Sequence, residues 1–454
     1  MASTAEQMAN NISFAKFSQA TDLKKRLWFT IGALIVFRLL SFVPLPGIDP
    51  TALGLLSEQT NGGVLDLFNN FSGGSLKRMS LTALGVTPYI TASIVIQLAT
   101  QLSPTLGAIK KDGESGRKRL NQYTRYGTVL LTAIQGYFIA VGLEAFGASQ
   151  GVAAVVEPGV VFRVGAVISL IGGTMFLMWL GEQITSRGIG NGVSLIIMAG
   201  IVANMPTTLY NLFEGGRSGS LDPVRLVGII LAVVFLVLLI CFMERAQRRI
   251  LIQYPKRQTQ RGMQADRSHL PLKINTAGVI PPIFASSLLL MPLTITQFAG
   301  KYVSGQSVWG DVIITLNQYL QHGSLLYMLL YGGGIIFFSF FYTAIVFNPE
   351  ETAENLKRHG GFIPGIRPGK NTEAYFDYVL TRITVVGAGY LTVICLLPEY
   401  LVSALSIPFY LGGTSLLIVV NVTMDTVTQI QSHLLAHQYG DLIKKAKLKG
   451  GRLR

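Results

Sequence analysis

Residues 226–243 have the sequence LVGIILAVVFLVLLICFM, an unbroken apolar stretch. As a helix it would rise about 27 Å, close to the roughly 30 Å thickness of the hydrocarbon layer of a bilayer. Half of the 454 residues are hydrophobic and only 13% are charged, whereas soluble domains average roughly 25% charged residues. The stretch therefore predicts a membrane-spanning helix, and the composition indicates that the chain contains several more.

Nine other apolar stretches are separated by short polar segments. Window hydropathy places them at Leu27–Val43, Leu81–Leu102, Thr128–Gly147, Val161–Gly181, Ile189–Met205, Ala277–Ala299, Ser324–Phe347, Ile383–Val402 and Leu405–Met424. The N-terminal segment Met1–Lys25 is polar and has no apolar core with a cleavage site, so we expect no cleavable signal peptide. The sequence thus predicts an all-α integral membrane protein with about ten transmembrane helices.

The basic residues are distributed very unevenly between the two sides of this topology. Thirty of the 37 Lys and Arg residues fall in the tails and loops of the side that holds both termini, and six fall on the other side. By the positive-inside rule, both termini are therefore expected in the cytoplasm. Short basic loops beside spans account for the net charge of +14 without a nucleic-acid-binding domain, although the larger loops could still bind acidic or ribosomal RNA partners.

The predicted spans contain almost no charge. A charge near the bilayer centre costs about 2.5 to 3.5 kcal/mol on insertion scales, and ion-coupled carriers keep a few because coupling needs them. Arg38 is the exception, near the outer end of the first span, where its side chain can reach the interface and act as a structural anchor.

Residues for chemistry are also missing from the sequence. It contains no Walker lysine motif, no zinc-binding pair on a helix and no serine-nucleophile elbow. Cys241 and Cys395 lie in apolar stretches without partners at metal-ligand spacing, and we interpret them as small hydrophobic residues. We therefore expect no catalytic, metal or cofactor site. A passive conduit fits this pattern, and so does a carrier of an uncharged solute.

One apolar pattern is too short to cross a membrane. Residues 64–71 combine polar residues with the apolar set Val64, Leu65, Leu67, Phe68 and Phe71. From the pattern alone, an interfacial helix is favoured over a re-entrant gate. Gly73 and Gly74 then form a flexible joint with the next span.

Several motifs together resemble one known family. They are FNNFSGGSLKR (68–78), ALGVTPYITASIVIQL (83–98), KKDGESGRKRLNQYTRYG (110–127), MWLGEQITSRGIGNG (178–192), LPLKINTAGVIPPIFASS (270–287), FFYTAIVFNPEETAENLK (340–357), GFIPGIRPG (361–369) and PFYLGGTSLLIVV (408–420). These stretches are similar to the SecY family, the pore subunits of the bacterial Sec protein-conducting channel. They cover nearly the whole chain in order.

The resemblance implies two pseudo-symmetric, inverted halves of five helices around a central pore. The halves would be residues 27–205 and 206–424, flanked by a cytosolic N-terminal tail (1–26) and a basic cytosolic C-terminal tail (425–454). In this family, residues at about 64–78, including Val64 to Gly74, form a plug that closes the external funnel. This assignment replaces the interfacial helix.

The resemblance also implies a pore ring and a lateral gate. The ring falls on Val86, Ile90, Val193, Ile197, Ile283 and Ile418. Such an aliphatic ring can seal by dewetting while offering a passing polypeptide nothing to bind. For each residue alone, ordinary helix packing would be the better explanation, and only the resemblance singles these residues out. The gate between the second and seventh spans would use Thr91, Ser93, Gln97, Asn275 and Thr276, since hydrogen bonds between membrane helices contribute only about 0.6 kcal/mol each.

Two long basic loops lie on the predicted cytoplasmic side. Loop 244–273 contains Lys256, Arg257 and Arg261, and loop 348–382 carries Arg367 on a tip rich in Pro and Gly. Rigid turn chemistry would hold Arg367 outward, where it could bind a partner or simply be solvated. The resemblance implies docking of the ATPase SecA and the ribosome on these loops. Further implied partners are SecE, SecG, accessory Sec membrane proteins, a membrane insertase, signal-sequence-bearing polypeptides and the lipid bilayer.

We therefore expect a passive, gated channel of the bacterial inner membrane that is not an enzyme. It would translocate unfolded secretory polypeptides and release membrane-protein segments laterally. The competing hypothesis is a secondary transporter of a small neutral solute, for which Pro281 and Pro282 could break the seventh span at a substrate site.

Overall fold

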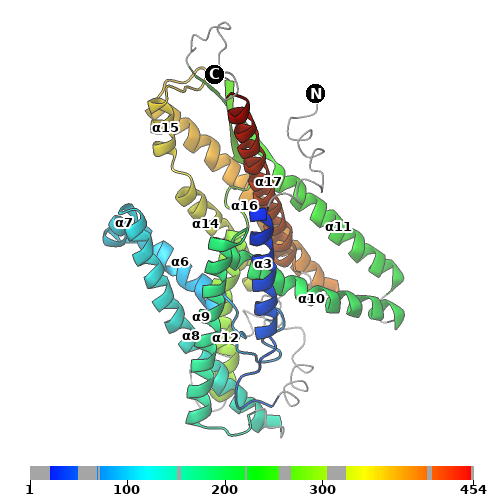
Figure 1. Ribbon diagram of the computed structural model, residues 1–454. Helices are drawn as coiled ribbons and strands as arrows, with labels where there is room; N and C mark the ends of the chain where they lie inside the picture. Colours follow the sequence, from blue (N-terminus) through cyan, green and yellow to red (C-terminus); the bar gives the residue numbers. More distant parts are fainter. Residues whose placement is uncertain are drawn as a thin grey trace.

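The computed structural model describes residues 21–49, 69, 72–150, 155–219, 222–254, 267–303, 324–405 and 412–450 (Figure 1). Within these ranges, ten long helices follow the ten predicted spans in order. They are α3 (Thr21–Leu40), α6 (Thr87–Leu102), α8 (Glu114–Gln150), α9 (Val160–Arg187), α10 (Gly192–Arg217), α11 (Pro223–Arg245), α12 (Ile280–Val303), α14 (Leu325–Val346), α16 (Lys370–Leu405) and α17 (Gly413–Gly450). Two short helices join them, α7 (Pro104–Lys111) and α15 (Pro349–Arg358).

Length and apolarity alone mark fewer of these helices as spans. In the described residues, six helices are long and apolar enough to cross a membrane, namely α8, α9, α10, α11, α14 and α16, with α14 counted together with α15 as Leu325–Arg358. A seventh candidate is α6 with α7, but these two bend by 106° at Ser103. Three other long helices are not among these six. Helices α3 and α17 have polar ends, and the described apolar part of α12 is short, Ile280–Leu290.

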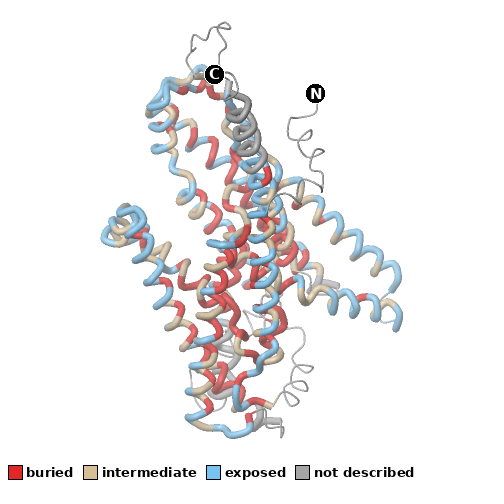
Figure 2. The backbone as a smooth tube through the Cα atoms, viewed as in Figure 1, coloured by how far each residue is buried: buried red, intermediate tan, exposed pale blue. Residues whose placement is uncertain are grey.

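The helices form two groups that meet along two seams. Helices α3, α6, α8, α9 and α10 pack among themselves, and so do α12, α14, α16 and α17, with α11 on α17. On one side α12 packs against α6 and α8, and on the other α10 packs against α17. One apolar core runs through both groups and both seams (Figure 2).

Several helices begin at residues other than the starts of the predicted spans, and local signals explain two of these differences. The second span begins at Thr87, not Leu81, because Gly85 adopts a positive φ and proline occupies the first turn. The fifth begins at Gly192, where Asn191 caps the helix. The tenth begins at Gly413 and continues to Gly450, so most of the predicted C-terminal tail prolongs the helix.

The all-α prediction missed a β-hairpin in the first basic loop. Strands β1 (Gln247–Gln253) and β2 (Arg267–Lys273) pair antiparallel, in the register Gln247↔Lys273. A further bridge joins Gln253 to Phe362 in the second basic loop. Residues of both loops pack together in a separate apolar cluster. Its buried members are Ile250, Leu272, Ala353, Ile363, Phe376, Val379, Leu380 and Ile383. The two loops are thus one packed unit.

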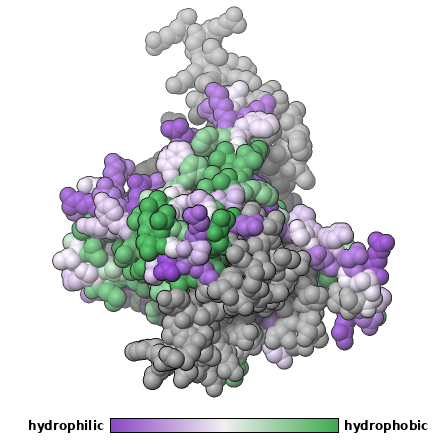
Figure 3. Space-filling model, turned by 90° about the horizontal axis from the view of Figure 1, so that it is seen from below, coloured by the Kyte–Doolittle hydropathy of each residue, from purple (hydrophilic) through white to green (hydrophobic). Residues whose placement is uncertain are grey.

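Large apolar side chains cover much of the outer surface of the helices. On α11 they include Leu231, Val234, Phe235 and Leu238, each more than half exposed. The view from below in Figure 3 shows a hydrophobic area that is interrupted by a few hydrophilic residues and flanked by hydrophilic clusters on both sides. In a helix bundle, such surfaces are stable only in contact with lipid or other apolar partners.

Candidate functional site

A small cavity lies between the two groups of helices. Its lining comes from the start of α6, from α10 and from α12, and consists of Val86, Thr87, Ile90, Ile197, Ile283, Ser286, Ser287 and Leu290. There is room for about one water molecule. Four of the six predicted ring residues, Val86, Ile90, Ile197 and Ile283, therefore surround one constricted space, and each is less than a tenth exposed.

The other two predicted ring residues lie in the surrounding core. Ile418 on α17 is fully buried, and Val193 in the first turn of α10 packs against the same cluster. Asn191 fixes this turn, because its side chain accepts hydrogen bonds from the backbone nitrogens of Val193 and Ser194 at 3.2 and 3.4 Å. Neither Val193 nor Ile418 lines the cavity.

The predicted plug is only partly within the described residues. Val64, Leu65, Leu67, Phe68 and Phe71 lie outside them. Gly73 and Gly74 are described, and both adopt positive φ, +69° and +83°, a conformation that glycine adopts without steric cost. They begin a series of turns that runs from Ser72 to Val86, where α6 starts.

This turn segment is hydrogen-bonded to the chain that follows α3, and Asn69, just before the segment, is hydrogen-bonded to α10. The amide nitrogen of Leu45 donates to the carbonyl of Met79, and that of Leu81 donates to the carbonyl of Val43, both at 2.9 Å. On the other side, the Asn204 amide of α10 donates to the carbonyl of Asn69 at 3.4 Å.

Arg38 has a partner that the sequence did not indicate. As predicted, it lies at the end of α3, but its Nη1 donates to the carbonyl oxygen of Gly73 at 2.6 Å. Arg78 donates to the same oxygen from Nη2 at 3.0 Å. Arg38 therefore contacts the predicted plug segment directly.

The five predicted gate residues lie on or beside the packed helices α6 and α12. Their hydrogen bonds are local, from Thr91 to the Thr87 carbonyl, from Gln97 to Ser93, and from Thr276 to the Lys273 carbonyl. Within the described residues, the predicted bonds between the two sets are therefore wrong.

The position of Asn275 explains part of this difference. Asn275 precedes α12, and its amide donates to the buried Glu244 carboxylate at the end of α11. Pro281 and Pro282 lie in the first turn of α12, where proline is well accommodated. They do not break the helix in mid-span, as a carrier site would require.

Of the four predicted docking residues, only Arg367 lies within the described residues. Lys256, Arg257 and Arg261 lie outside the described residues. Arg367 is exposed, on a tip where Gly365 and Gly369 adopt positive φ. The tip is anchored below by Ile363, which is buried in the cluster that joins the two loops. The structure thus presents Arg367 outward on a packed base.

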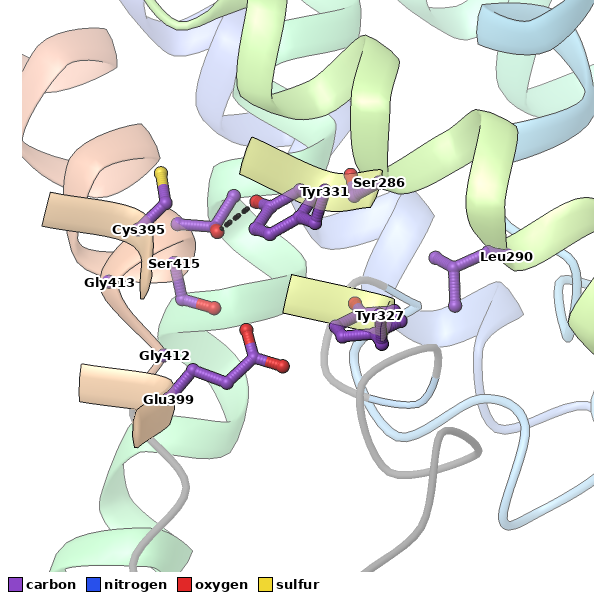
Figure 4. Close-up of a pocket in the computed structure, with 10 residues that line it drawn as sticks. Ser286, Leu290, Tyr327, Tyr331, Cys395, Glu399, Gly412, Gly413 and Ser415 are labelled. Atoms are coloured by element: carbon purple, nitrogen blue, oxygen red, sulfur yellow. Dashed lines mark hydrogen bonds between the residues drawn. The ribbon is translucent and has the colours of Figure 1, made fainter. Parts of the chain in front are cut away.

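A second cavity contains a carboxylate inside the predicted ninth span (Figure 4). Glu399 is buried, as are the neighbouring Tyr327 and Tyr331, and Tyr331 shares a 2.6 Å hydrogen bond with Thr414. Ser286 and Leu290 line this cavity and the central one, so α12 separates the two.

Arg38 is therefore not the one exception to charge-free spans. Besides Glu399, an ion pair of 2.6 Å joins Arg163 and Glu144 near the ends of α9 and α8. In the sequence, the only indication of these residues is that glutamate and arginine occur within the predicted apolar spans.

Comparison with known proteins identifies the family. The SecY family model matches residues 80–427. The chain is 54% identical over 430 residues to protein translocase subunit SecY of Escherichia coli K12, covering 94% of this chain and 96% of that protein. The chain belongs to the SecY family. It is accordingly a channel subunit of a protein translocase, held in a membrane by its apolar helices.

Solved channel structures share the fold of this SecY-family chain. One is a SecY structure whose plug domain stabilises the closed state and maintains a membrane seal, with a TM-score of 0.61 and 18% identity. Another is Sec61 in the canine ribosome–channel complex, with a TM-score of 0.60 and 15% identity. Each covers 90% of this chain and 92% of the other. The predicted architecture, two helical halves around a central pore, is confirmed.

Proposed function

We propose that this SecY-family chain conducts unfolded secretory polypeptides through the cavity lined by Val86, Ile90, Ile197 and Ile283. The observation that carries the proposal is that residues from both helical halves meet at this one aliphatic constriction. Apolar walls can keep a narrow space dry when it is empty, and they form no lasting hydrogen bonds with a passing chain. Only the hydroxyls of Thr87, Ser286 and Ser287 interrupt the lining.

The lateral exit would open between α6 and α12. These helices pack against each other, yet the polar side chains Thr91, Ser93, Gln97 and Thr276 bond locally rather than across. Separating the helices therefore breaks apolar contacts and no hydrogen bond of these four side chains. A hydrophobic segment of the translocating chain can replace such contacts with its own.

The joined basic loops would serve as the docking platform. We place this platform and both termini in the cytoplasm, with the chain in the bacterial inner membrane, on the basis of the uneven charge distribution. The exposed Arg367, with Lys256, Arg257 and Arg261 in the adjoining loop, would bind SecA or the ribosome. SecE and SecG would complete the membrane complex. The chain itself would supply no catalytic group, so the driving force comes from these partners or from the proton-motive force.

Crosslinking tests the conduction pathway. Ile90→Cys and Ile283→Cys channels are loaded with a secretory chain that is stalled in transit and carries one cysteine in its hydrophilic mature part. Val95→Cys on α6 and Leu288→Cys on α12 are matched controls, since both side chains point to the surface. Disulfides should form at Ile90 and Ile283 and be absent at the controls. Equal crosslinking at all four positions, or none at Ile90 and Ile283, would refute the assignment.

A further inference from the structure

A buried carboxylate lies where α11 ends and the first basic loop begins. Glu244, the last residue but one of α11, is only 6% exposed. The side-chain amide nitrogen of Asn275 donates to its Oε1 at 2.5 Å and also to the carbonyl oxygen of Gly278 at 3.1 Å. One amide group therefore connects the end of α11 with the turn that leads into α12.

This place is unfavourable for a negative charge. Burial penalises a charged group, and the C-terminal end of a helix repels an anion. Lys273 of β2 attracts the carboxylate and Asp425 of α17 repels it, so these two effects partly cancel. The hydrogen bond from Asn275 is the direct contact that stabilises the carboxylate. Because an apolar pair would join the two segments without these costs, we interpret the bond as a device that fixes position.

The bond closes the base of the β-hairpin. The chain leaves the helices at Glu244 and returns at Asn275, with β1 and β2 between them. Beside this bond, the backbone nitrogen of Ile274 donates to the carbonyl oxygen of Ala246 at 3.1 Å. The outgoing and returning chains are thus joined twice, once by the backbone and once by side chains, before α12 begins at Ile280.

Neighbouring helices leave the turn before α12 little freedom. A Cβ on Gly387 of α16 would lie 2.7 Å from the carbonyl oxygen of Ile274. On another side, a Cβ on Gly278 would lie 3.7 Å from the amide nitrogen of Asn421 on α17. The turn continues directly into α12, whose first turn carries Ile283 to the central cavity. The position of the turn therefore sets the position of Ile283.

We propose that Glu244 is a positioning residue for the central constriction: through Asn275 it fixes the start of α12 and so holds Ile283 at the cavity. The proposal rests on the proposed function, because it assumes that the polypeptide passes the constriction that Ile283 lines. The base of the hairpin and the constriction are then positioned by the same bond. Without the acceptor, the turn before α12 is free to shift, and Ile283 should leave the cavity that it shares with Ile90.

Disulfide formation measures this position directly. Ile90 and Ile283 line one cavity with room for about one water molecule, so cysteines at both positions should pair on mild oxidation of the resting channel. The background carries Cys241→Ala and Cys395→Ala, and mass spectrometry follows the loss of free thiol. Glu244→Ala removes the acceptor of a charge-assisted bond and should slow pairing about tenfold. Glu244→Gln keeps an oxygen that can accept, so its rate should stay within about twofold.

Exchanging donor and acceptor provides the matched test. Asn275→Asp removes the donor and places two carboxylates together, so it should also slow pairing about tenfold. The double variant Glu244→Gln with Asn275→Asp reverses the bond. It should recover pairing to within about threefold, because the bond to Gly278 is not restored. Asn211→Asp makes the same change at an exposed residue of α10 and should leave the rate unaltered.

Equal pairing in Glu244→Ala and Glu244→Gln would overturn the positioning role. If Glu244→Ala does not fold, the double variant decides, since a rate no faster than that of Asn275→Asp would overturn the role as well. Absence of pairing with Glu244 and Asn275 intact would overturn both hypotheses, because Ile90 and Ile283 would not share a cavity. If pairing follows the expected order but a stalled secretory chain does not crosslink at these two positions, only the proposed conduction pathway is wrong.

Discussion

The adjacent glycines Gly172 and Gly173 provide a sharp test of how α9 packs against the turn that leads into α6. A Cβ at Gly173 would lie 2.0 Å from the carbonyl oxygen of Leu81 and 2.7 Å from its carbonyl carbon. A Cβ at Gly172 would have no atom within 4 Å. The two alanine variants thus differ by one position in the same helix and have opposite surroundings.

The loss of stability expected for Gly173→Ala follows from how far the new Cβ and the Leu81 carbonyl must move apart. Since real Cβ contacts are essentially never closer than 3.0 Å, Leu81 or α9 has to move by at least the difference from 2.0 Å, which is about 1 Å. Leu81 is held by its hydrogen bond to the Val43 carbonyl at 2.9 Å, so this movement strains the turn. Overpacking of this kind costs about 1 to 3 kcal/mol, whereas alanine in a helix interior gains up to about 1 kcal/mol over glycine.

We therefore expect Gly172→Ala to unfold at the same temperature as the unaltered protein or slightly higher. Gly173→Ala should lose about 1 kcal/mol of unfolding free energy, because an overpacking cost of about 2 kcal/mol is partly offset by a helix gain of about 1 kcal/mol. Thermal unfolding of the purified protein in detergent, followed by intrinsic fluorescence, compares the two directly. If both variants unfold together, the close contact between α9 and Leu81 does not exist, and the position assigned to the turn before α6 is wrong.

Two further variants test other parts of the structure. Phe376→Ala empties a fully buried site in the cluster that joins the basic loops, so it should lower the local stability by about 3 to 5 kcal/mol. Hydrogen exchange should become faster in β1, β2 and the Arg367 tip, and Tyr378→Ala, at an exposed residue, is the control. Unchanged exchange would contradict the joint cluster. Asn191→Ala removes the cap of α10 and should lower the free energy of unfolding by about 1 kcal/mol, measured by thermal unfolding. Asn191→Asp should keep the cap and the stability. Equal stability of the two variants would show that the cap contributes nothing.

The sequence predicted the helices well because a bilayer imposes a simple rule on length and polarity. Each of the ten predicted spans overlaps a helix of the described chain. The start of α6 was misplaced because residues 81–86 are apolar enough to satisfy a hydropathy window although they form turns. Gly85 and Pro88 were the local signals for the true start. Hydropathy measures burial, not backbone conformation.

The β-hairpin was missed for a different reason. The many charges of the first basic loop favour a solvated segment, and they conceal the alternation of its apolar residues. In β1 the buried positions are Ile250 and Ile252, two residues apart as expected for a strand with one buried face. Such a pattern predicts a strand, but only the structure gives the partner surface, which the second loop supplies through Phe362 and Ile363.

The site was predictable only as far as the family resemblance reaches. Isoleucine and valine at helical spacing do not distinguish a pore ring from ordinary packing, and the resemblance singled out the four residues that the cavity brings together. It did not indicate the partner of Arg38. The Gly73 oxygen is 35 residues away in the chain, and an acceptor on the backbone leaves no trace in side-chain patterns.

The turn segment from Ser72 to Val86 links these separate features into one mechanical unit. Its buried hydroxyls form a chain in which Thr82 donates to Ser75 and shares a hydrogen bond with Ser80. Breaking one of these bonds leaves a buried hydroxyl unpaired, at a cost of about 1 to 3 kcal/mol, so the segment resists internal deformation. A displacement that begins at Gly73 should therefore be transmitted to Leu81 and Val86 rather than absorbed between them.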